Sequence, residues 1–502
     1  MTPDELNAAV LIGAAVVLLA VAAVRLAVGT GMPSLLIYLG LGVVVGNSQL
    51  GAHLQDYELT GALGYAALAL ILAEGGLSTR WSHIRPVVAP AAALATVGTA
   101  ISIVVTGAAV HWLLDVGWAY GFLVGAVLSS TDAAAVFSVL RRVPLPRRLT
   151  ALLEAESGFN DAPVVIAVVA ITEAMTGHAT GPWWLYVLIA AAELAGGAAV
   201  GLGIGYLGAS RLRAIALPSS GLYPIAVMSL CLLAYGAASV AHASGFLAVY
   251  VAALVLGNSR LPHRAAVRGF AEGLGWLGQI GLFVLLGLVV NLETLDDVIA
   301  PALVTGLALL LVARPLSVFL TLLPFPTTWR QQLFLSWAGL RGAVPIVLAT
   351  IPVAAGAPGT RNLFELVFLL VVVFTLVQAP ALPAVAKWLK VQGDGAQDVE
   401  LESSPLGRIG AEVLHVSIGK DSKMSGVALF ELRLPVGANV TLIVRGDQTL
   451  VPESGTVLRH GDELLLVVPE AVRDRTEERL RAVSRGGRLA DWRDGGMRRR
   501  EI

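Results

Sequence analysis

The sequence predicts an α-helical polytopic membrane protein that carries a small α+β domain. Of its 502 residues, 56 % are hydrophobic and another 54 are glycine, while only 14 % are charged; soluble proteins average about a quarter. Residues 391–502 nevertheless hold 16 of the 34 basic and 18 of the 35 acidic side chains. Composition therefore excludes a soluble globule and indicates a long membrane domain followed by a short polar one. The net charge of −1 provides no field that would attract nucleic acid.

Thirteen apolar runs are candidates for crossing the roughly 30 Å hydrocarbon core of a bilayer. They lie near residues 6–29, 33–47, 60–76, 87–112, 117–141, 150–175, 183–208, 222–241, 244–257, 266–291, 299–322, 331–353 and 361–386. The second and ninth runs are short. The first run lacks a preceding basic segment and is longer than the apolar core of a signal peptide, so we expect it to be retained.

Basic residues near the ends of these runs fall almost entirely on one side of the predicted membrane. One side holds only Arg361, and the other holds Arg25, Arg80, Arg85, Arg141, Arg142, Arg147, Arg148, Arg211, Arg213, Arg260, Arg264, Arg268, Arg330, Lys387 and Lys390. Because cytoplasmic loops are enriched in Lys and Arg, we expect an external N-terminus and a cytoplasmic C-terminal domain in the plasma membrane.

A few charged residues lie inside the apolar runs. They are Arg314, Arg341, Glu74, Asp132, Glu154, Glu156, Asp161, Glu193 and Glu272. An ionised side chain at mid-membrane costs at least about 2.5–3.5 kcal/mol, so these groups must face one another or a watery cavity. We interpret them as parts of an ion or proton pathway, with structural ion pairs as the alternative. Glu193 and Glu272 are the best candidates for structural or interfacial positions.

The fifth run contains a polar break at Ser129-Ser130-Thr131-Asp132. Ser and Thr compete for backbone hydrogen bonds, and unwound backbone at membrane depth is tolerated only where it lines protein or a cavity. We predict a discontinuous helix whose carbonyls, Thr131 hydroxyl and Asp132 carboxylate face a cavity. A capped kink with a structural Asp132 is the alternative.

The sixth run places a hydroxyl, an amide and a carboxylate on neighbouring positions of one helix. Ser157 and Asp161 are four residues apart, as are Glu156 and Asn160. Hard oxygen ligands of this kind suit an alkali cation. Burial and a nearby Asp132 would both favour the neutral form of Asp161, so this carboxyl group could hold a proton or a cation, but not both. That competition is an exchange mechanism.

A second break, Gly339-Leu340-Arg341-Gly342-Ala343-Val344-Pro345, interrupts the twelfth run. It lies seven runs after the first break and therefore has the opposite orientation. Two interrupted helices at matching places in inverted halves indicate a mid-membrane binding site of a secondary transporter. Arg341 can offset the carbonyl ends of the half-helices, and either Arg314 or Arg341 can pair with Glu156; the sequence leaves this choice open.

These motifs resemble those of the cation:proton antiporter-1 family, over the whole of residues 1–390. The resemblance implies an inverted-repeat fold of 13 helices with two broken crossing helices, a homodimer, and a core that moves against a dimer domain. It also implies that Asp161 is the ion-exchanging carboxylate, with Asp132, Thr131, Ser157 and Asn160 as its supporting residues, and that Glu156 forms a structural ion pair with an arginine. The Asn160-Asp161 pair implies electroneutral exchange of one cation for one proton.

Beyond residues 391–404, a polar linker, the pattern changes to that of a small α+β domain. Strands are expected at 412–418, 439–444 and 463–468, a short helix at 426–432 and a charged helix at 471–483. Residues 405–485 resemble the TrkA-C type of domain, which implies dimerisation and a small regulatory ligand; a purely structural tail is the alternative. Residues 486–502 are expected to be a charged tail.

The combined prediction is a monovalent-cation/proton antiporter without enzyme activity or cofactor. K⁺ is favoured over Na⁺ because the appended domain resembles regulators of potassium conductance. The alternatives are a Na⁺/H⁺ antiporter, a regulated cation channel and a sensor that no longer transports. A glycine pattern at 203–208 imitates a dinucleotide-binding loop but has no strand before it, so Gly197, Gly201 and Gly205 are interpreted as a close helix contact.

Overall fold

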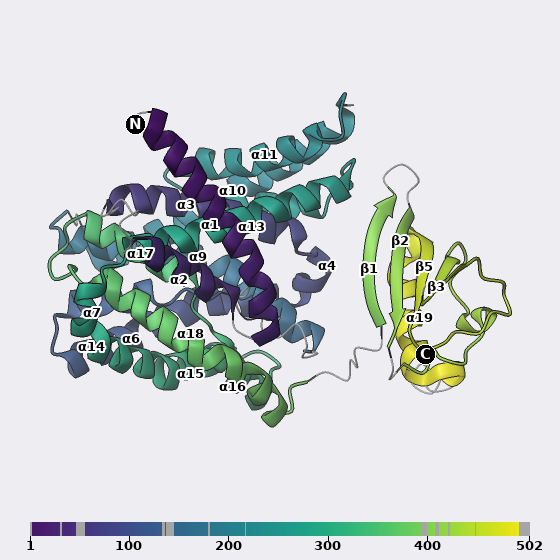
Figure 1. The fold of residues 1–502 in the computed structure, drawn as a ribbon. Coiled ribbons are helices and arrows are strands. Elements are labelled where there is room, and N and C mark those ends of the chain that lie inside the picture. Colours follow the sequence, from purple (N-terminus) through teal and green to yellow (C-terminus); the bar gives the residue numbers. More distant parts are fainter. Residues whose placement is uncertain are drawn as a thin grey trace. The chain divides into compact units, whose positions relative to one another are not determined.

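The computed structural model describes residues 3–30, 33–46, 56–132, 136, 145–178, 181–215, 217–392, 399–406, 411–419, 422–446 and 448–490. The chain forms two compact units, one comprising nearly all of residues 1–392 and one comprising residues 393–502. The first unit is helical and the second is built on a β-sheet (Figure 1).

The first half of the helical unit extends from α1 to α10. Its helices are α1 (Pro3–Thr30), α2 (Ser34–Gly46), α3 (Tyr57–Ser78), α4 (Trp81–Ile84), α5 (Val88–Ala93), α6 (Thr99–Leu114), α7 (Trp118–Val127), α9 (Arg147–Met175) and α10 (Trp183–Ala214). Short 3-10 and π turns join α4, α5 and α6 into one helical segment, Trp81–Leu114.

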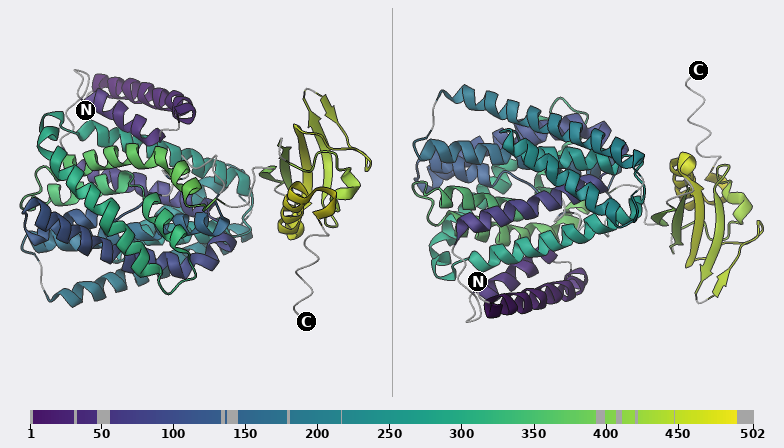
Figure 2. Two further views of the ribbon diagram at one scale, coloured as in Figure 1. Left: turned by 90° about the horizontal axis from the view of Figure 1, so that it is seen from below. Right: turned by 90° about the horizontal axis from the view of Figure 1, so that it is seen from above.

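The second half of this unit extends from α11 to α18. Its helices are α11 (Leu222–Val240), α12 (Gly245–Gly257), α13 (Arg264–Val289), α14 (Leu295–Ala308), α15 (Arg314–Leu322), α16 (Trp329–Ala338), α17 (Ala343–Ala354) and α18 (Leu363–Trp388). Figure 2 shows many of the helices of this unit side by side.

Each of the thirteen predicted apolar runs overlaps at least one of these helices, but a count of thirteen spans is not established. Within the described residues, eight helices are long and apolar enough to cross a membrane, and the bent pair α16 and α17 makes a ninth. Four further apolar helices are shorter: Val10–Val24 of α1, α2, α7 and α12. The short second and ninth runs thus correspond to helices of 13 residues each.

Both predicted breaks are present in the backbone. Helix α7 ends at Val127, and residues 130–132 have no helical structure. Helices α16 and α17 are separated at 339–342 and bent by 56°. The two π turns, Leu94–Gly98 and Leu309–Ala313, lie in the fourth and eleventh predicted runs, which are also seven runs apart. This matching of irregularities agrees with an inverted repeat.

The expected glycine contact joins α10 and α12. A Cβ atom added at Gly197 would lie 2.4 Å from the Ser244 carbonyl oxygen, and one at Gly201 would lie 2.5 Å from that of Ala248. No side chain fits at such distances, so these glycines allow two helix backbones to approach closely. The interpretation as helix packing is confirmed.

The second unit is a five-stranded antiparallel sheet with strand order β1-β2-β5-β3-β4. Its strands are β1 (Val399–Leu406), β2 (Ala411–Ile418), β3 (Asn439–Arg445), β4 (Gln448–Leu450) and β5 (Asp462–Pro469). Leu480 and Val483 of α19 (Arg473–Gly486) join the core formed by one face of the sheet. The predicted short helix is a 3-10 turn, Leu429–Leu432.

Two elements of this sheet differ from the sequence prediction. Strand β4 was not expected, and β1 begins at Val399 although residues 391–404 were assigned to a linker. The apolar alternation of β1 lasts only from Val399 to Glu402 and is followed by Pro405, so it is too short to identify a half-buried strand; pairing with β2 along one edge provides the backbone hydrogen bonds. The predicted tail lies mostly outside the described residues, which end at 490.

Candidate functional site

The two helix breaks meet each other in the middle of the helical unit. The backbone N–H of Asp132 donates a hydrogen bond to the carbonyl oxygen of Leu340 at 2.8 Å. A Cβ atom at Gly342 would lie 1.9 Å from the Asp132 carboxylate, so only glycine allows this approach. Pro345 lies in the first turn of α17, where its missing N–H leaves no hydrogen bond unmade.

Asp161, on α9, lies beside this crossing. Its side chain is buried, with 7 % of the residue exposed, and the Ser130 hydroxyl donates a 2.6 Å hydrogen bond to its Oδ1. The preceding Ser129, in the turn that follows α7, instead donates to the Gly125 carbonyl of α7. In the segment after α7, the Ser129 hydroxyl therefore binds a backbone carbonyl of α7, and the Ser130 hydroxyl binds the Asp161 carboxylate.

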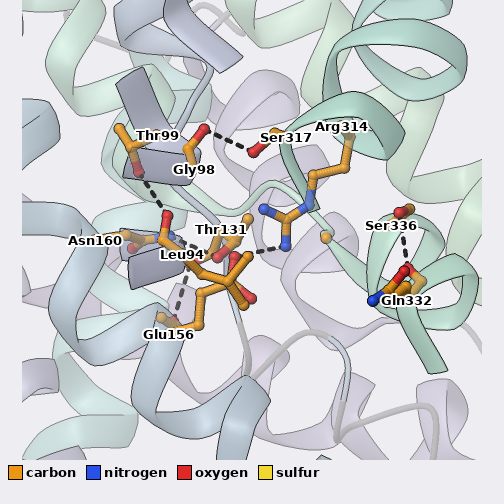
Figure 3. A network of polar contacts seen from close by, with 12 residues as sticks. Leu94, Gly98, Thr99, Thr131, Glu156, Asn160, Arg314, Ser317, Gln332 and Ser336 are labelled. Atoms are coloured by element: carbon orange, nitrogen blue, oxygen red, sulfur yellow. Dashed lines mark hydrogen bonds and ion pairs between the residues drawn. The ribbon is translucent and has the colours of Figure 1, made fainter. Parts of the chain in front are cut away.

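Thr131 connects the unwound segment to two further residues of α9. The Ser157 hydroxyl donates to the Thr131 carbonyl oxygen at 2.9 Å, and the Asn160 amide donates to the Thr131 hydroxyl at 2.6 Å. Figure 3 shows Asn160 and Thr131 turned toward each other. Asn160 is 1 % exposed and does not line the cavity described below, so its hydrogen bond holds Thr131 from the protein interior.

Glu156 pairs with Arg314. The distance from Arg314 Nη2 to Glu156 Oε1 is 2.6 Å, and the two side chains are 6 % and 2 % exposed (Figure 3). Arg341 is equally buried, but its Nη1 donates to the Gly339 carbonyl at 3.3 Å. Of the two arginines that the sequence allows, Arg314 thus contacts Glu156, and Arg341 contacts a carbonyl at the end of α16.

A cavity of about 450 Å³ reaches the crossing. Four of the expected ion-binding residues line it: Asp161, Asp132, Thr131 and Ser157. Asn160, Glu156, Arg314 and Arg341 do not. The lining also includes Glu74, Ser78 and Arg80, at the C-terminal end of α3 and just beyond it, so the cavity extends toward the predicted cytoplasmic side. A monovalent cation could be surrounded here by carboxylate, hydroxyl and carbonyl oxygens.

The sequence prediction omitted one residue that touches the central carboxylate. Ser130 belongs to the same polar break as Thr131 and Asp132, but a sequence does not show which hydroxyl turns toward α9. Of the remaining membrane-embedded acids, Glu154 lines the cavity with Asp161, whereas Glu193 lines a separate cavity of about 340 Å³. Glu272 is exposed on α13.

The sodium/hydrogen exchanger transmembrane family matches residues 13–388, which contain every residue of this crossing. The chain belongs to this family. A second match, to the TrkA-C domain, covers residues 413–481 and confirms the resemblance of the C-terminal unit.

Curated relatives align with most of the length of this chain. It is 36 % identical to the K⁺/H⁺ antiporter NhaP2 of Shewanella oneidensis over 94 % of this chain and 83 % of the relative. It is 34 % identical to the K⁺/H⁺ antiporter NhaP of Alkalimonas amylolytica, over 92 % and 82 %. The Na⁺/H⁺ antiporter ApNhaP of Aphanothece halophytica is 30 % identical over 65 % of this chain and 64 % of its own.

The fold of the family member also matches a solved structure. The sodium proton antiporter MjNhaP1 of Methanocaldococcus jannaschii superimposes with a TM-score of 0.68, covering 77 % of this chain and 99 % of its own. The sequence identity is 22 %, so this likeness concerns the fold. The expectation of a helical antiporter fold with an appended α+β domain is thereby confirmed.

Proposed function

We propose that this protein exchanges a monovalent cation for a proton across the plasma membrane, with Asp161 binding each in turn. The observation that carries the proposal is the position of Asp161: a buried carboxylate at the crossing of two broken helices, lining a cavity together with Asp132, Thr131 and Ser157. A proton neutralises such a carboxylate as well as a cation does, so the two compete. Alternating access of this site to the two faces then gives antiport.

The exchange is electroneutral, one cation for one proton. Asp161 is flanked by Asn160, which binds Thr131 and adds no charge. If only Asp161 changes its occupant, the moving site carries the same charge in both directions. Glu156 is neutralised by Arg314 and takes no part in the exchange.

K⁺ is the preferred cation. Two relatives that align with more than 90 % of the length of this chain are named K⁺/H⁺ antiporters, whereas the alignment with the Na⁺/H⁺ antiporter ApNhaP covers 65 % of that length. The TrkA-C match adds a domain that resembles regulators of potassium conductance. Na⁺/H⁺ exchange on the same fold is the second candidate, supported by ApNhaP. A cation channel is disfavoured because a channel filter needs rings of carbonyls rather than one buried carboxylate.

The proposal includes the remaining organisation of the protein. Residues 1–390 form the exchanger, in a homodimer with the N-terminus outside, and residues 405–485 form a cytoplasmic regulatory domain that binds a small ligand. The distribution of basic residues supports this orientation. The residues around 391–404 connect the two parts, and 486–502 form a charged tail.

Proteoliposomes test the proposal directly. A pH gradient is imposed and challenged with K⁺, Na⁺ or Li⁺, with the membrane potential either clamped or free. We expect K⁺ to dissipate the gradient at the lowest concentration, equally in both electrical conditions, and Asp161→Asn to abolish exchange in a folded protein. Dissipation of the pH gradient by Na⁺ alone would identify Na⁺, rather than K⁺, as the exchanged cation. A current without proton movement would exclude antiport.

A further inference from the structure

A second polar cavity, of about 470 Å³, lies at the opposite ends of two helices that line the Asp161 cavity. Helix α3 contributes Tyr57, at its beginning, to this second cavity and Glu74, near its end, to the first. Helix α17 contributes Val353, near its end, to the second and Ala343, at its beginning, to the first. The two cavities therefore approach the helical unit from opposite ends of the same helix pair.

Close packing of α3 against α17 separates the two cavities. A Cβ atom added at Gly61 would lie 2.8 Å from the Thr350 hydroxyl, and one at Gly64 would lie 2.8 Å from Val347 Cγ1. Helix backbones that meet at such small residues leave no room for a hydrated ion between them. Whatever enters the second cavity is thus held apart from Asp161.

Glu365, in the first turn of α18, lines the second cavity. It is 3 % exposed, and its Oε2 has no hydrogen-bond partner among the residues that the structure describes. The other titratable or charged lining residues are Tyr57 of α3 and Arg361, which is exposed and makes no ion pair with Glu365 within the described part of the chain. Burying a carboxylate whose oxygen has no hydrogen-bond partner costs free energy unless a cation or a proton neutralises the group.

The surroundings of Glu365 offer the remaining ligands. Four residues with amide or hydroxyl groups, Asn291, Asn362, Thr294 and Thr360, line the same cavity. Amide, hydroxyl and carboxylate oxygens are the ligands of hard monovalent cations. We propose that Glu365 is the centre of a second site for a monovalent cation, at the opposite end of α3 from the Asp161 cavity. This site is additional to the exchange at Asp161.

Equilibrium binding of radioactive Rb⁺ to the purified full-length protein tests this site without measuring transport. We expect Asp161→Asn to keep about half of the Rb⁺ bound at saturation, because the Glu365 site remains. Adding Glu365→Gln, which nearly conserves size but removes the negative charge, is expected to remove the remainder. Adding Glu58→Gln instead serves as the matched control, because Glu58 is an exposed carboxylate in the first turn of α3, beside Tyr57.

Two results would overturn the inference: no Rb⁺ bound to a folded Asp161→Asn variant, or unchanged residual binding after Glu365→Gln is added. Thermal unfolding of each variant, compared with that of the unmodified protein, establishes that it is folded. Failure of the exchange proposal is distinguishable, because it would appear as transport by Asp161→Asn whatever the binding result at Glu365.

Discussion

Glu156 of α9 and Arg314 of α15 form an ion pair of 2.6 Å in which both side chains are almost fully buried. The pair joins a helix that carries the candidate ion site to a helix of the other half of the fold. Because both side chains are shielded from solvent, water cannot take the place of either partner. The pair is therefore a fixed structural contact, and its loss affects folding before it affects ion binding.

Replacing Glu156 by Gln is expected to destabilise the protein. The substitution leaves the Arg314 guanidinium buried without a counter-charge, and breaking a buried pair in this way typically costs about 3–5 kcal/mol. Thermal unfolding in detergent should show a clearly lower midpoint. Glu272→Gln, which changes an exposed acid on α13, is the control. An unchanged midpoint for Glu156→Gln would mean that Arg314 finds another partner.

Replacing Gly342 by Ala is expected to abolish exchange. The added Cβ would overlap the Asp132 carboxylate, forcing the two helix breaks apart. Gly75→Ala is the matched control, because Gly75 lines the same cavity but has open space where its Cβ would lie. Proton fluxes in proteoliposomes measure both variants. Wild-type transport by Gly342→Ala would contradict the close approach of the breaks.

Replacing Ser130 by Ala is expected to weaken cation binding. The variant loses the 2.6 Å hydrogen bond to Asp161, and a hydrogen bond to a charged group contributes about 1.5–3 kcal/mol. The KM for the cation should therefore rise by about tenfold or more. Ser129→Ala removes the neighbouring hydroxyl, which donates to Gly125, and should leave KM nearly unchanged. Equal effects of the two substitutions would argue against a specific role of Ser130.

Acid is expected to loosen the C-terminal sheet through Asp462. This carboxylate is fully buried and accepts hydrogen bonds from the Arg445 side chain and the Arg459 backbone. Burial alone would raise the pKa of Asp462, but the hydrogen bonds and the charges of Arg445 and Arg459 outweigh it, so the pKa lies below its ordinary value.

The stability that Asp462 contributes is accordingly present above its unfolded pKa of about 4 and is lost as the pH falls through the lower folded value. Hydrogen exchange of peptides from β3 and β5 in the full-length protein should stay slow at pH 5–7, once corrected for the intrinsic rate, and accelerate below about pH 4. Asp462→Asn should exchange faster at pH 7 and respond less to acid. The same acid response in both proteins would assign it to other groups.

Thiol labelling tests whether the two cavities open to opposite faces. Cys231 is the single cysteine and is buried, so Cys231→Ala provides a background without thiols. In that background a membrane-impermeant reagent should modify Ser78→Cys only from the cytoplasmic side and Thr294→Cys only from the outside, because each residue lines a different cavity. Modification of both from one side would contradict this arrangement.

The helical unit could be predicted well because its sequence carries strong local signals. Apolar runs located the helices, and the two breaks were recognisable from Ser, Thr, Gly and Pro within such runs. The number of spans remained less certain because α2 and α12 are short, and their boundaries depend on packing rather than on length.

The partner of each charged residue could not be predicted. The choice between Arg314 and Arg341 for Glu156 depends on how α15 lies against α9, and sequence distance carries no such information. Glu365 could not be singled out for a similar reason: it lies near the start of its run, where an acid is ordinarily solvated, and only packing buries it. Strand β1 was missed because its apolar alternation ends at Glu402 and is followed by Pro405.

The hydrogen bond between Asp132 and Leu340 has a consequence for biosynthesis. The segment with Asp132 is translated long before the segment with Leu340, and Glu156 likewise precedes Arg314. A nascent chain that has inserted only its first half would therefore hold Glu156 without the Arg314 charge, and the Asp132 backbone N–H without its Leu340 acceptor, in the bilayer. The contact between the two helix breaks cannot form until the second half has been inserted, so a truncated product would carry the ion-binding side chains without the second break that lies against them.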